Sequence, residues 1–228
     1  MTALRMLATV APAGVSVCEA FADPPAAVLL PAERSKVADA VAKRRLEYAT
    51  GRWCARTALA DLGVPAVAVR SGDHGEPCWP AGVVGSITHC DGYRAAAVAH
   101  RSDLHGIGID AEPHDRLPDG VLALVAGPAE RDRLAALGRV DPAWHWDRLL
   151  FSAKESVYKA WFPLARRWLD FSDADLTVEP GPDSGSGIFT ARLTVAGPLV
   201  GGTELTVLSG RWLIRGGLVV TAVTVPAR

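Results

Sequence analysis

The sequence predicts an α+β fold, in which a helical region followed by a group of short strands occurs twice along the chain. Three observations support this prediction. The chain has 228 residues, 49% of them hydrophobic, which is enough for one large domain or two small ones. Residues 33–62 have a helical composition, and residues 83–109 are short apolar segments between turn residues. Residues 121–164 are again helical in pattern, and apolar segments separated by glycines follow them.

The first half begins with one long expected helix. We place it over Glu33–Leu62, because this stretch has no proline, is rich in Ala, Arg, Lys and Leu, and ends before a Gly and a Pro. Gly51 could split it. Strands are expected at Val83–Thr88, Arg94–Ala99 and Leu104–Ile109. The Asp-Gly and Arg-Ser-Asp turns between them indicate an antiparallel meander.

The second half has two predicted helices and then returns to strands. The helices are expected over residues 121–138 and from Trp144 to Leu164. A Pro-, Gly- and Ser-rich stretch at Pro180–Gly187 is interpreted as a solvent loop. The expected strands of the tail are Ile188–Val195, Glu204–Leu208, Trp212–Ile214 and Leu218–Val225.

The charge of the chain excludes a general nucleic-acid binder. It has 24 Lys and Arg residues against 25 Asp and Glu, whereas proteins that bind duplexes need a basic excess to neutralise phosphates. The charges are unevenly distributed, however. Residues 1–70 carry nine basic and six acidic side chains, residues 101–147 carry five and nine, and residues 148–170 carry five and two. An acidic middle region therefore lies between two basic stretches.

The cysteines and the N-terminus indicate a reducing compartment. Cys18, Cys54, Cys78 and Cys90 form no Cys-x-x-Cys pair and have no histidine at zinc-finger spacing, so neither a zinc ribbon nor a disulfide framework is predicted. The apolar N-terminal run is interrupted by a proline and a glycine and has no clear cleavage site. No run reaches about 18 apolar residues, so no membrane span is expected. We expect a cytoplasmic protein with free thiols.

Two carboxylates follow the third expected strand. Strand alternation places Gly108, Asp110 and Glu112 on one face and the neighbouring isoleucines on the other. Like charges this close repel, so a pKa would rise unless Mg²⁺ or a basic group compensated. The alternative is that the two acids are solvated at a strand end.

A polar face is expected on the helix that begins at Trp144. At about 100° per residue, Arg148, Glu155 and Lys159 lie on one face, and apolar residues lie on the opposite face. Lys154 lies on the flank, from which it could reach the same ligand. An ordinary Glu–Lys surface pair at i,i+4 would give a similar pattern.

Donors for phosphate groups are expected in the first half. The segment Gly-Ser-Ile-Thr88-His89 ends a strand in a turn and could present Thr88 and His89 to a phosphate. Otherwise His89 would simply be exposed. Arg44, Arg45 and Arg52 could clamp a phosphate, unless they form a solvated basic face. On an unbroken helix Arg45 shares the face of Arg52, whereas Arg44 is about 80° away.

The order of these segments is more informative than any one of them. Gly-Ser-Ile-Thr-His-Cys precedes Gly-Ile-Asp-Ala-Glu, and about forty residues later comes Phe-Ser-Ala-Lys-Glu-Ser-Val-Tyr-Lys. This combination resembles the 4′-phosphopantetheinyl transferases of the large, Sfp/EntD-like class, and most closely the actinobacterial branch that modifies polyketide, mycolate and siderophore carrier proteins. The resemblance covers roughly residues 40–170.

The resemblance implies transfer of the phosphopantetheine arm from coenzyme A to a serine of an apo acyl or peptidyl carrier protein, with release of adenosine 3′,5′-bisphosphate. Mg²⁺, for which Mn²⁺ could substitute, would bridge the pyrophosphate of coenzyme A. The implied metal ligands are Asp110, Glu112 and Glu155. The implied coenzyme A contacts are Arg44, Arg52, Arg70, Glu76, Thr88, His89, Lys154 and Lys159. The implied catalytic residues are Glu155, Lys159 and His89, with Glu155 or a metal-bound water taking the proton of the carrier serine.

Two criteria disagree on which arginine acts together with Arg52. Alignment with the family motif favours Arg44, whereas helix geometry favours Arg45. We follow the alignment, and a helix break at Gly51 would remove the conflict.

The resemblance also implies two similar α/β subdomains related by a pseudo-twofold axis, with the site in the cleft between them. We expect residues 1–105 to bind coenzyme A and residues 106–228 to hold the metal and the catalytic groups. A monomer is expected, because one chain supplies both halves of the cleft. Carrier proteins are acidic and should meet an apolar and basic surface, unless that segment is a core turn. The expected surface is formed by Phe162, Leu164, Arg166, Arg167 and Trp168.

Two other functions were weighed against this one. Another Mg²⁺-dependent phosphoryl or nucleotidyl enzyme would need a Walker-type loop or an Asp-rich polymerase motif, and the sequence has neither. A non-catalytic carrier-protein or nucleotide-binding module of the same fold remains the alternative. The intact acids and Lys159 argue against it.

Overall fold

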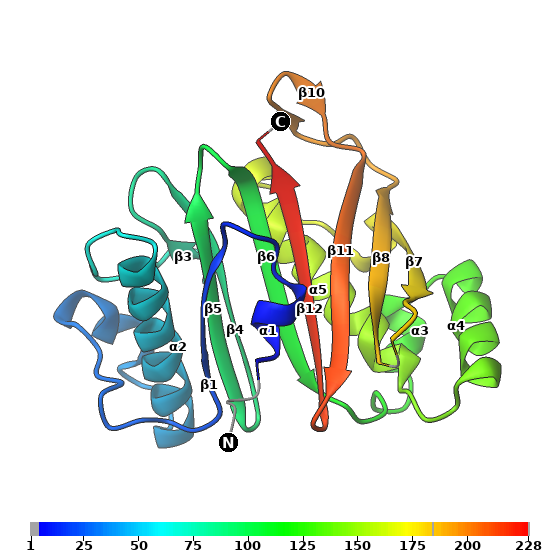
Figure 1. Ribbon diagram of the computed structural model, residues 1–228, viewed down its shortest axis with the longest axis horizontal. Coiled ribbons are helices and arrows are strands. Elements are labelled where there is room, and N and C mark those ends of the chain that lie inside the picture. Colours follow the sequence, from blue (N-terminus) through cyan, green and yellow to red (C-terminus); the bar gives the residue numbers. More distant parts are fainter. Residues whose placement is uncertain (1–4, 184, 228) are drawn as a thin grey trace.

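Two antiparallel sheets form the centre of the computed structural model, which describes residues 5–183 and 185–227 (Figure 1). The smaller sheet has the strand order β1-β5-β4, and the larger has the order β6-β12-β11-β8-β7. The strands of the smaller sheet are β1 (Ser16–Ala20), β4 (Val83–Cys90) and β5 (Tyr93–His100). Those of the larger are β6 (Leu104–Pro113), β7 (Ala174–Pro180), β8 (Ser186–Leu193), β11 (Val207–Arg215) and β12 (Leu218–Pro226). Two short pairs complete the set, β2 (Arg70–Ser71) with β3 (Pro77–Cys78) and β9 (Leu199–Val200) with β10 (Thr203–Glu204).

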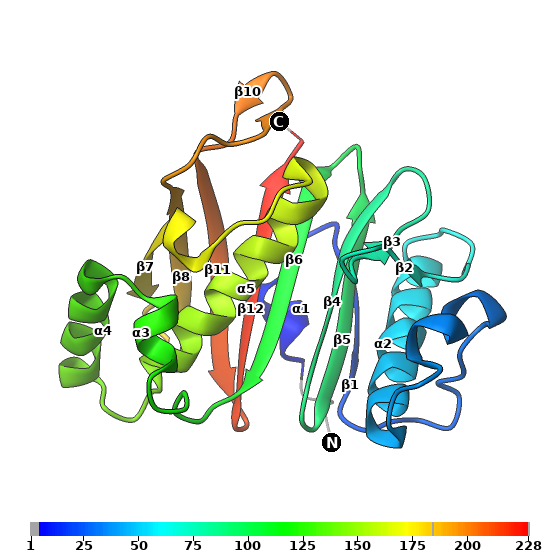
Figure 2. The same ribbon diagram turned by 180° about the vertical axis from the view of Figure 1, so that it is seen from behind.

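One long helix packs on each sheet. The helices are α1 (Leu7–Val10), α2 (Ala42–Asp61), α3 (Val121–Val125), α4 (Pro128–Val140) and α5 (Trp146–Ala165), with 3₁₀ turns at Pro31–Val37 and Phe171–Asp173. α2 packs on β5 and β1, and α5 lies along β6 and β12 (Figure 2). Because one helix belongs to each sheet, the two faces that carry long polar side chains come from different halves of the chain.

The N-terminal segment joins the two halves. α1 packs on β12 and β11, and its Leu7 and Val10 enter a core that contains Tyr93 from one sheet and Ile109 from the other. The carboxylate of Glu19 accepts hydrogen bonds from the backbone N–H groups of Met6 and Leu7 and from the Tyr93 hydroxyl. The apolar N-terminal run is thus a component of the core.

The predicted α+β class is confirmed, and several element boundaries differ from expectation. The first helix begins at Ala42 instead of Glu33, because the preceding residues form a 3₁₀ turn that starts at Pro31. Gly51 does not split it. The helical region at 121–138 is two helices, since Gly127 adopts an extended conformation and Pro128 begins a new helix.

The strands also depart from the expected meander. β6 does not pair with β5; it pairs along its length with β12 at the other end of the chain. β1 and β7 were not expected, and residues 204–208 are divided between β10 and β11. Pro180 and Ser186 belong to paired strands, so the expected solvent loop is shorter than predicted.

The seam between β4 and β6 is closed by side chains. The hydroxyl of Ser86 accepts a hydrogen bond from the backbone N–H of Ile109, and that of Thr88 accepts one from Ala111. Both distances are 3.1 Å. Polar side chains of β4 therefore satisfy backbone groups on the free edge of β6, which is how the two sheets meet without a shared ladder.

Glycine on β6 lets α5 approach the sheet. A Cβ atom added at Gly108 would lie 1.9 Å from the carbonyl oxygen of Ser156, and one at Gly106 would lie 3.2 Å from Leu164. The helix backbone thus occupies the space that a side chain would need. This close approach brings the polar face of α5 against the carboxylates of β6.

No helix among the described residues is long and apolar enough to cross a bilayer.

Candidate active site

Asp110 and Lys159 form the centre of the polar cluster. Asp110 is 4% exposed on β6, and the ammonium group of Lys159 donates to its Oδ1 at 2.7 Å. The Thr88 hydroxyl donates to the same oxygen at 3.2 Å. The other oxygen, Oδ2, is buried and has no hydrogen-bond partner among the described residues. A buried carboxylate oxygen without a partner is costly, so this atom is available to a ligand.

Glu112 is held by an arginine in a similar way. Nη1 of Arg148 donates to Glu112 Oε2 at 3.0 Å. Burial and the nearby charge of Asp110 raise the pKa of Glu112 to about 7, although Arg148 and Lys159 oppose the shift. The two acids thus repel one another enough that a cation between them would be stabilising.

Glu155 projects from the face of α5 that also carries Arg148 and Lys159. It lies four residues before Lys159 and seven after Arg148, which places all three on one face. Its carboxylate accepts no hydrogen bond from the described residues. Burial and the charge of Asp110 raise its pKa, and Lys159 opposes the shift. Glu155 is therefore a more basic carboxylate than an exposed one, with a free pair of oxygens.

Cations from the first half lie at one end of this cluster. Arg44 on α2 contacts Nε2 of His89, which ends β4, and Glu47 lies within 4.0 Å of both residues. Partial burial and the charges of Arg44 and Lys159 lower the pKa of His89 to about 4. The imidazole is thus neutral at pH 7 and able to donate from one nitrogen.

Arg52 is a buried cation on the same helix as Arg44. It is 4% exposed, its guanidinium lies 4.2 Å from the centre of the Tyr48 ring, and Nη2 donates to the Ser71 hydroxyl at 2.7 Å. Burial and the charge of Arg44 lower its pKa. Its Nε is buried without an acceptor among the described residues. An anion at this position would satisfy both arginines.

Arg45 points elsewhere. It lines a shallow groove with Leu29, Arg34 and Leu46, on a different side of α2 from His89. The helix is continuous through Gly51, so no break removes the conflict between Arg44 and Arg45, and Arg44 is the one that contacts His89.

The loop before β4 carries Arg70 and Glu76. Arg70 is exposed at the start of β2, next to the Ser71 that binds Arg52. The carboxylate of Glu76 accepts a hydrogen bond from the backbone N–H of His74. It also forms an ion pair with Arg166, in which Nη1 of Arg166 lies 3.1 Å from Oε1 of Glu76. Arg166 follows α5, so this ion pair links the two halves across the site. Arg166 is also the only residue other than glycine with a positive φ in the described chain.

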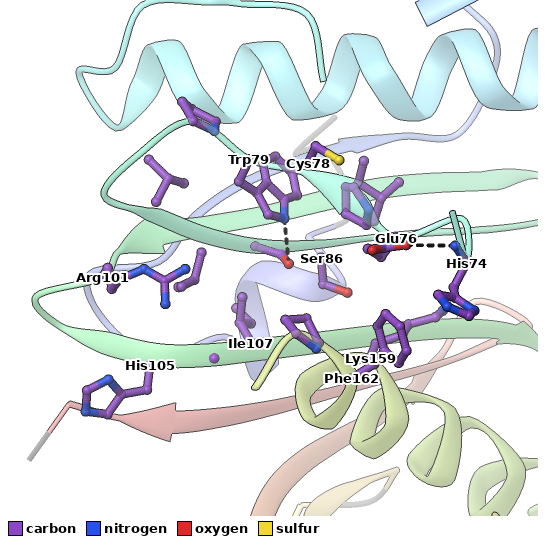
Figure 3. A pocket seen from close by; sticks show the side chains of 18 of the residues that line it. His74, Glu76, Cys78, Trp79, Ser86, Arg101, His105, Ile107, Lys159 and Phe162 are labelled. Carbon is purple, nitrogen blue, oxygen red and sulfur yellow. Dashed lines mark hydrogen bonds between the residues drawn. The ribbon is translucent and has the colours of Figure 1, made fainter. Parts of the chain in front are cut away.

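A pocket of about 500 Å³ lies between this loop and α5 (Figure 3). Lys159 lies at one end of it and Arg101 and His105 lie at the other. Glu155 also lines it. Its walls are apolar, from Pro77, Trp79, Val84, Ile87, Ile107, Tyr158 and Phe162. A smaller pocket of about 260 Å³ lies on the other side of Glu155 and Tyr158, under Trp168. Glu155 therefore lines both pockets.

Two predicted contact residues are occupied by the protein itself. Nζ of Lys154 donates to Glu130 at 2.9 Å and to the carbonyl oxygens of Phe171 and Ala174. An ammonium group has three donors, and here all three meet protein acceptors, so the structure places Lys154 with Glu130 and not with the other predicted coenzyme A contacts. Thr88 is 2% exposed, and its hydroxyl is used by Asp110 and Ala111 in the seam. It positions Asp110 instead of presenting itself in a turn.

Some residues of the site carried little signal in the sequence. Glu47 lies within 4.0 Å of Arg44, Arg94 and the neutral imidazole of His89, and its spacing of three from Arg44 was the only indication. Ser71 binds Arg52 from a loop, where no periodicity marks it. Such contacts between distant segments follow from the fold alone.

The donor set fits a hard divalent cation that is shared with a ligand. Within residues 5–183 and 185–227, no three His, Cys, Asp or Glu side chains lie close enough together to hold a metal ion by themselves. Asp110 nevertheless offers a buried, unpartnered Oδ2, and Glu112 and Glu155 are acids with raised pKa. Mg²⁺ prefers one or two carboxylates together with phosphate oxygens and water, so an open set of this kind suits it.

Comparison with known proteins matches both halves of the chain. Residues 32–99 match the 4′-phosphopantetheinyl transferase N-terminal domain, and residues 106–193 match the 4′-phosphopantetheinyl transferase superfamily. The transferase PptT of Mycobacterium tuberculosis is 50% identical over 98% of this chain and 99% of its own length. Npt of Nocardia iowensis is 51% identical over 96% and 99%. Enterobactin synthase component D of Escherichia coli K12 is 40% identical over 52% of this chain and 55% of its own length.

The chain therefore belongs to the 4′-phosphopantetheinyl transferase superfamily, and the resemblance noted in its motifs is confirmed. It is an enzyme of that class, a transferase of the 4′-phosphopantetheine group.

Proposed function

We propose that this enzyme transfers the phosphopantetheine arm of coenzyme A to a serine hydroxyl of apo acyl or peptidyl carrier proteins, in a reaction that depends on Mg²⁺ and also runs with Mn²⁺. The observation that carries the proposal is the buried Oδ2 of Asp110, which has no partner among the described residues, in a carboxylate that binds Lys159. The family and its carrier-protein chemistry support the substrate class.

The coenzyme A would be held through its phosphates by the first half. Arg44 and Arg52 are suited to the 3′-phosphate, because a guanidinium binds phosphate through two parallel donors. His89 and Lys159 are suited to the pyrophosphate, which lies nearest the acids. Arg70 and Glu76 would flank the adenosine from the loop.

Asp110, Glu112 and Glu155 would hold the divalent cation. When bound, this ion supplies positive charge that stabilises the pyrophosphate as the bond to the leaving group breaks. Lys159 adds a fixed positive charge at the same place. Such pre-positioned charges are a large source of rate enhancement in phosphoryl transfer.

The proton of the carrier serine would pass to Glu155. Its raised pKa makes it a better base than an exposed carboxylate, and its oxygens are free. The serine oxygen then forms a bond to the phosphorus that bears the pantetheine arm. The bond from that phosphorus to the bridging oxygen breaks, and adenosine 3′,5′-bisphosphate leaves with the electron pair.

The carrier protein would dock beyond the end of α5. Arg166, Arg167 and Trp168 are exposed there, with Trp168 at 71%, and they fit an acidic partner with an apolar contact. Phe162 and Leu164 are oriented inward, since Phe162 is 6% exposed and meets the His74 ring edge to face, and Leu164 packs near Gly106. These two residues therefore support the surface from below.

The same chain would act as a monomer, because the acids and cations of the site come from its two halves. All four cysteines are free thiols, which supports a cytoplasmic location.

The test is to mix the protein with coenzyme A, Mg²⁺ and an apo carrier protein and to measure the mass of the carrier. We expect a gain of one phosphopantetheine group, its loss when EDTA is added, and its recovery with Mg²⁺ or Mn²⁺. Binding of coenzyme A without a mass gain on several apo carriers would instead favour a non-catalytic binding module.

A further inference from the structure

Arg148, in the first turn of α5, makes three hydrogen bonds with one side chain. Nη1 donates to Glu112 Oε2 at 3.0 Å, Nε to the carbonyl oxygen of Asp115 at 3.0 Å, and Nη2 to that of Arg116 at 2.9 Å. The guanidinium thus joins Glu112 to the backbone that follows it. The planar fork of arginine suits this arrangement, and the ammonium group of lysine would not reproduce it.

Arg148 and Lys159 each bind one of the two acids of β6 through a single carboxylate oxygen. They lie eleven residues apart on α5, about three turns, and so project from the same face. Lys159 binds Asp110 through Oδ1, and Arg148 binds Glu112 through Oε2. Oδ2 of Asp110 is buried without a hydrogen-bond partner among the described residues, and the hydrogen bond that Glu112 accepts from Arg148 uses Oε2, not Oε1.

We propose that Arg148 is a positioning residue for the transfer reaction. By holding Glu112 through one carboxylate oxygen, Arg148 fixes the rotamer that leaves the second carboxylate oxygen for the divalent cation. A metal-binding side chain that is already fixed binds the ion more tightly, because less side-chain freedom is lost on binding. This inference rests on the proposed function, because it presumes that Glu112 binds a metal ion there.

A purely structural role for Arg148 can be separated from this one. The neighbouring Asp147 also tethers the segment after β6, since its Oδ2 accepts from the backbone N–H of Leu117 at 2.9 Å. Asp147 makes no hydrogen bond to Glu112. Asp147→Ala therefore loosens the same segment without releasing the carboxylate, and it serves as the matched control.

The experiment measures Mn²⁺ binding by electron paramagnetic resonance in the presence of coenzyme A and without carrier protein. We expect the dissociation constant for Mn²⁺ to rise by roughly 10-fold or more in Arg148→Ala and by less in Arg148→Lys. In Asp147→Ala it should stay within about 2-fold of the unmodified protein. Calorimetric binding of coenzyme A without metal should be unchanged in all three, since Arg148 does not contact the phosphate-binding cations.

A double variant tests whether Arg148 acts through Glu112. If it does, Arg148→Ala should add no further loss of Mn²⁺ affinity once Glu112→Gln is present. Additive losses would overturn the proposal.

The other outcomes are also decisive. Equal Mn²⁺ affinity in the unmodified protein, Arg148→Ala and Arg148→Lys would leave Arg148 a structural residue and the proposed function intact. If Arg148→Ala does not fold, Arg148→Lys decides alone, and unchanged affinity in it overturns the inference. Failure of the unmodified protein to bind Mn²⁺ with coenzyme A would overturn the metal role itself, and this inference with it.

Discussion

The helices α2 and α5 solve the same packing problem in opposite ways. Both have 20 residues and each packs on one sheet, α2 on β5 and β1 and α5 on β6 and β12. On α2 the glycine is in the helix, where a Cβ at Gly51 would lie 3.2 Å from Ile87 of β4. On α5 the glycine is in the strand, where Gly108 admits the helix backbone. The tighter approach occurs on the side that carries the acids.

The two helices also differ in the charge that they leave available. α2 contributes Arg44 and Arg52, whose partners are mostly neutral groups, so the first half of the site retains positive charge. α5 and β6 contribute acids that keep oxygens without partners. One half is thus prepared for an anion and the other for a cation, which is what a ligand made of phosphates and a metal ion requires.

The largest effect is expected at Glu155. Glu155→Gln removes the base and one negative charge while keeping the shape, so we expect transfer to fall by about 10³-fold or more. The melting temperature should change little, because the side chain makes no hydrogen bond within the described residues. A rate assay with coenzyme A and apo carrier measures the effect. A variant that retains more than a tenth of the activity would contradict the role of Glu155 as base.

The two lysines of α5 should separate stability from activity. Lys154→Met leaves Glu130 buried without its cation, which should destabilise the fold by about 3–5 kcal/mol. Lys159→Met should cost less stability, since Lys159 is partly exposed and Asp110 keeps Thr88, but should lower transfer by about 100-fold. Denaturant unfolding and rate assays on both variants measure this. The assignment of Lys154 to structure would be lost if its replacement left stability unchanged.

The two arginines of α2 should separate the 3′-phosphate from the remainder of coenzyme A. Arg44→Ala should raise the KM for coenzyme A by about 10-fold, because a charge-assisted hydrogen bond is lost, and should leave the KM for 3′-dephospho-coenzyme A unchanged. Arg45→Ala is the matched control and should change neither value. The reverse pattern would show that Arg45 binds the phosphate.

The smallest effect is a pH dependence at Glu112. Burial and Asp110 raise its pKa to about 7, from an ordinary value of 4.5. Between these pH values the folded protein keeps a proton that the unfolded chain has released. This residue therefore stabilises the metal-free protein below about pH 4.5, and its contribution is lost as the pH rises to about 7.

Glu112→Gln should lack this dependence. Relative to the variant, the unmodified protein should lose of the order of 2 kcal/mol of unfolding free energy between pH 5 and pH 8. Urea unfolding in EDTA at several pH values measures the difference. Parallel curves for the two proteins would show that the pKa of Glu112 is not raised.

Periodicity and spacing were enough to predict the polar face of α5 and the acids of β6. Glu155, Lys159 and Asp110 come together because side chains recur every 3.6 residues on one face of a helix and every two residues on one face of a strand, as expected. Lys154 could not be assigned in this way. Its position on the flank of the helix lets the side chain turn either toward the site or toward the protein interior. The acceptors that hold it in the interior, Glu130 and Phe171, come from distant segments.

The pairing of β6 was also beyond local patterns. Its neighbour in sequence is β5, and its partner β12 is more than 100 residues away. The choice depends on burial of both faces of β6, under α5 on one side and α1 on the other. Arg44 was assigned by alignment, whereas helix geometry alone favoured Arg45. The contact of Arg44 with His89 depends on how α2 sits against β4, which the sequence does not display.

The close contact at Gly108 also limits how this sequence can drift. Every other amino acid adds a Cβ atom, which would lie 1.9 Å from a backbone oxygen that cannot rotate away. A conservative replacement by alanine is therefore excluded as firmly as a large one, and no compensating change in a neighbouring side chain could restore the space. Among descendants of this gene that keep the activity, we expect position 108 to be the least variable site in β6, ahead of the acids beside it.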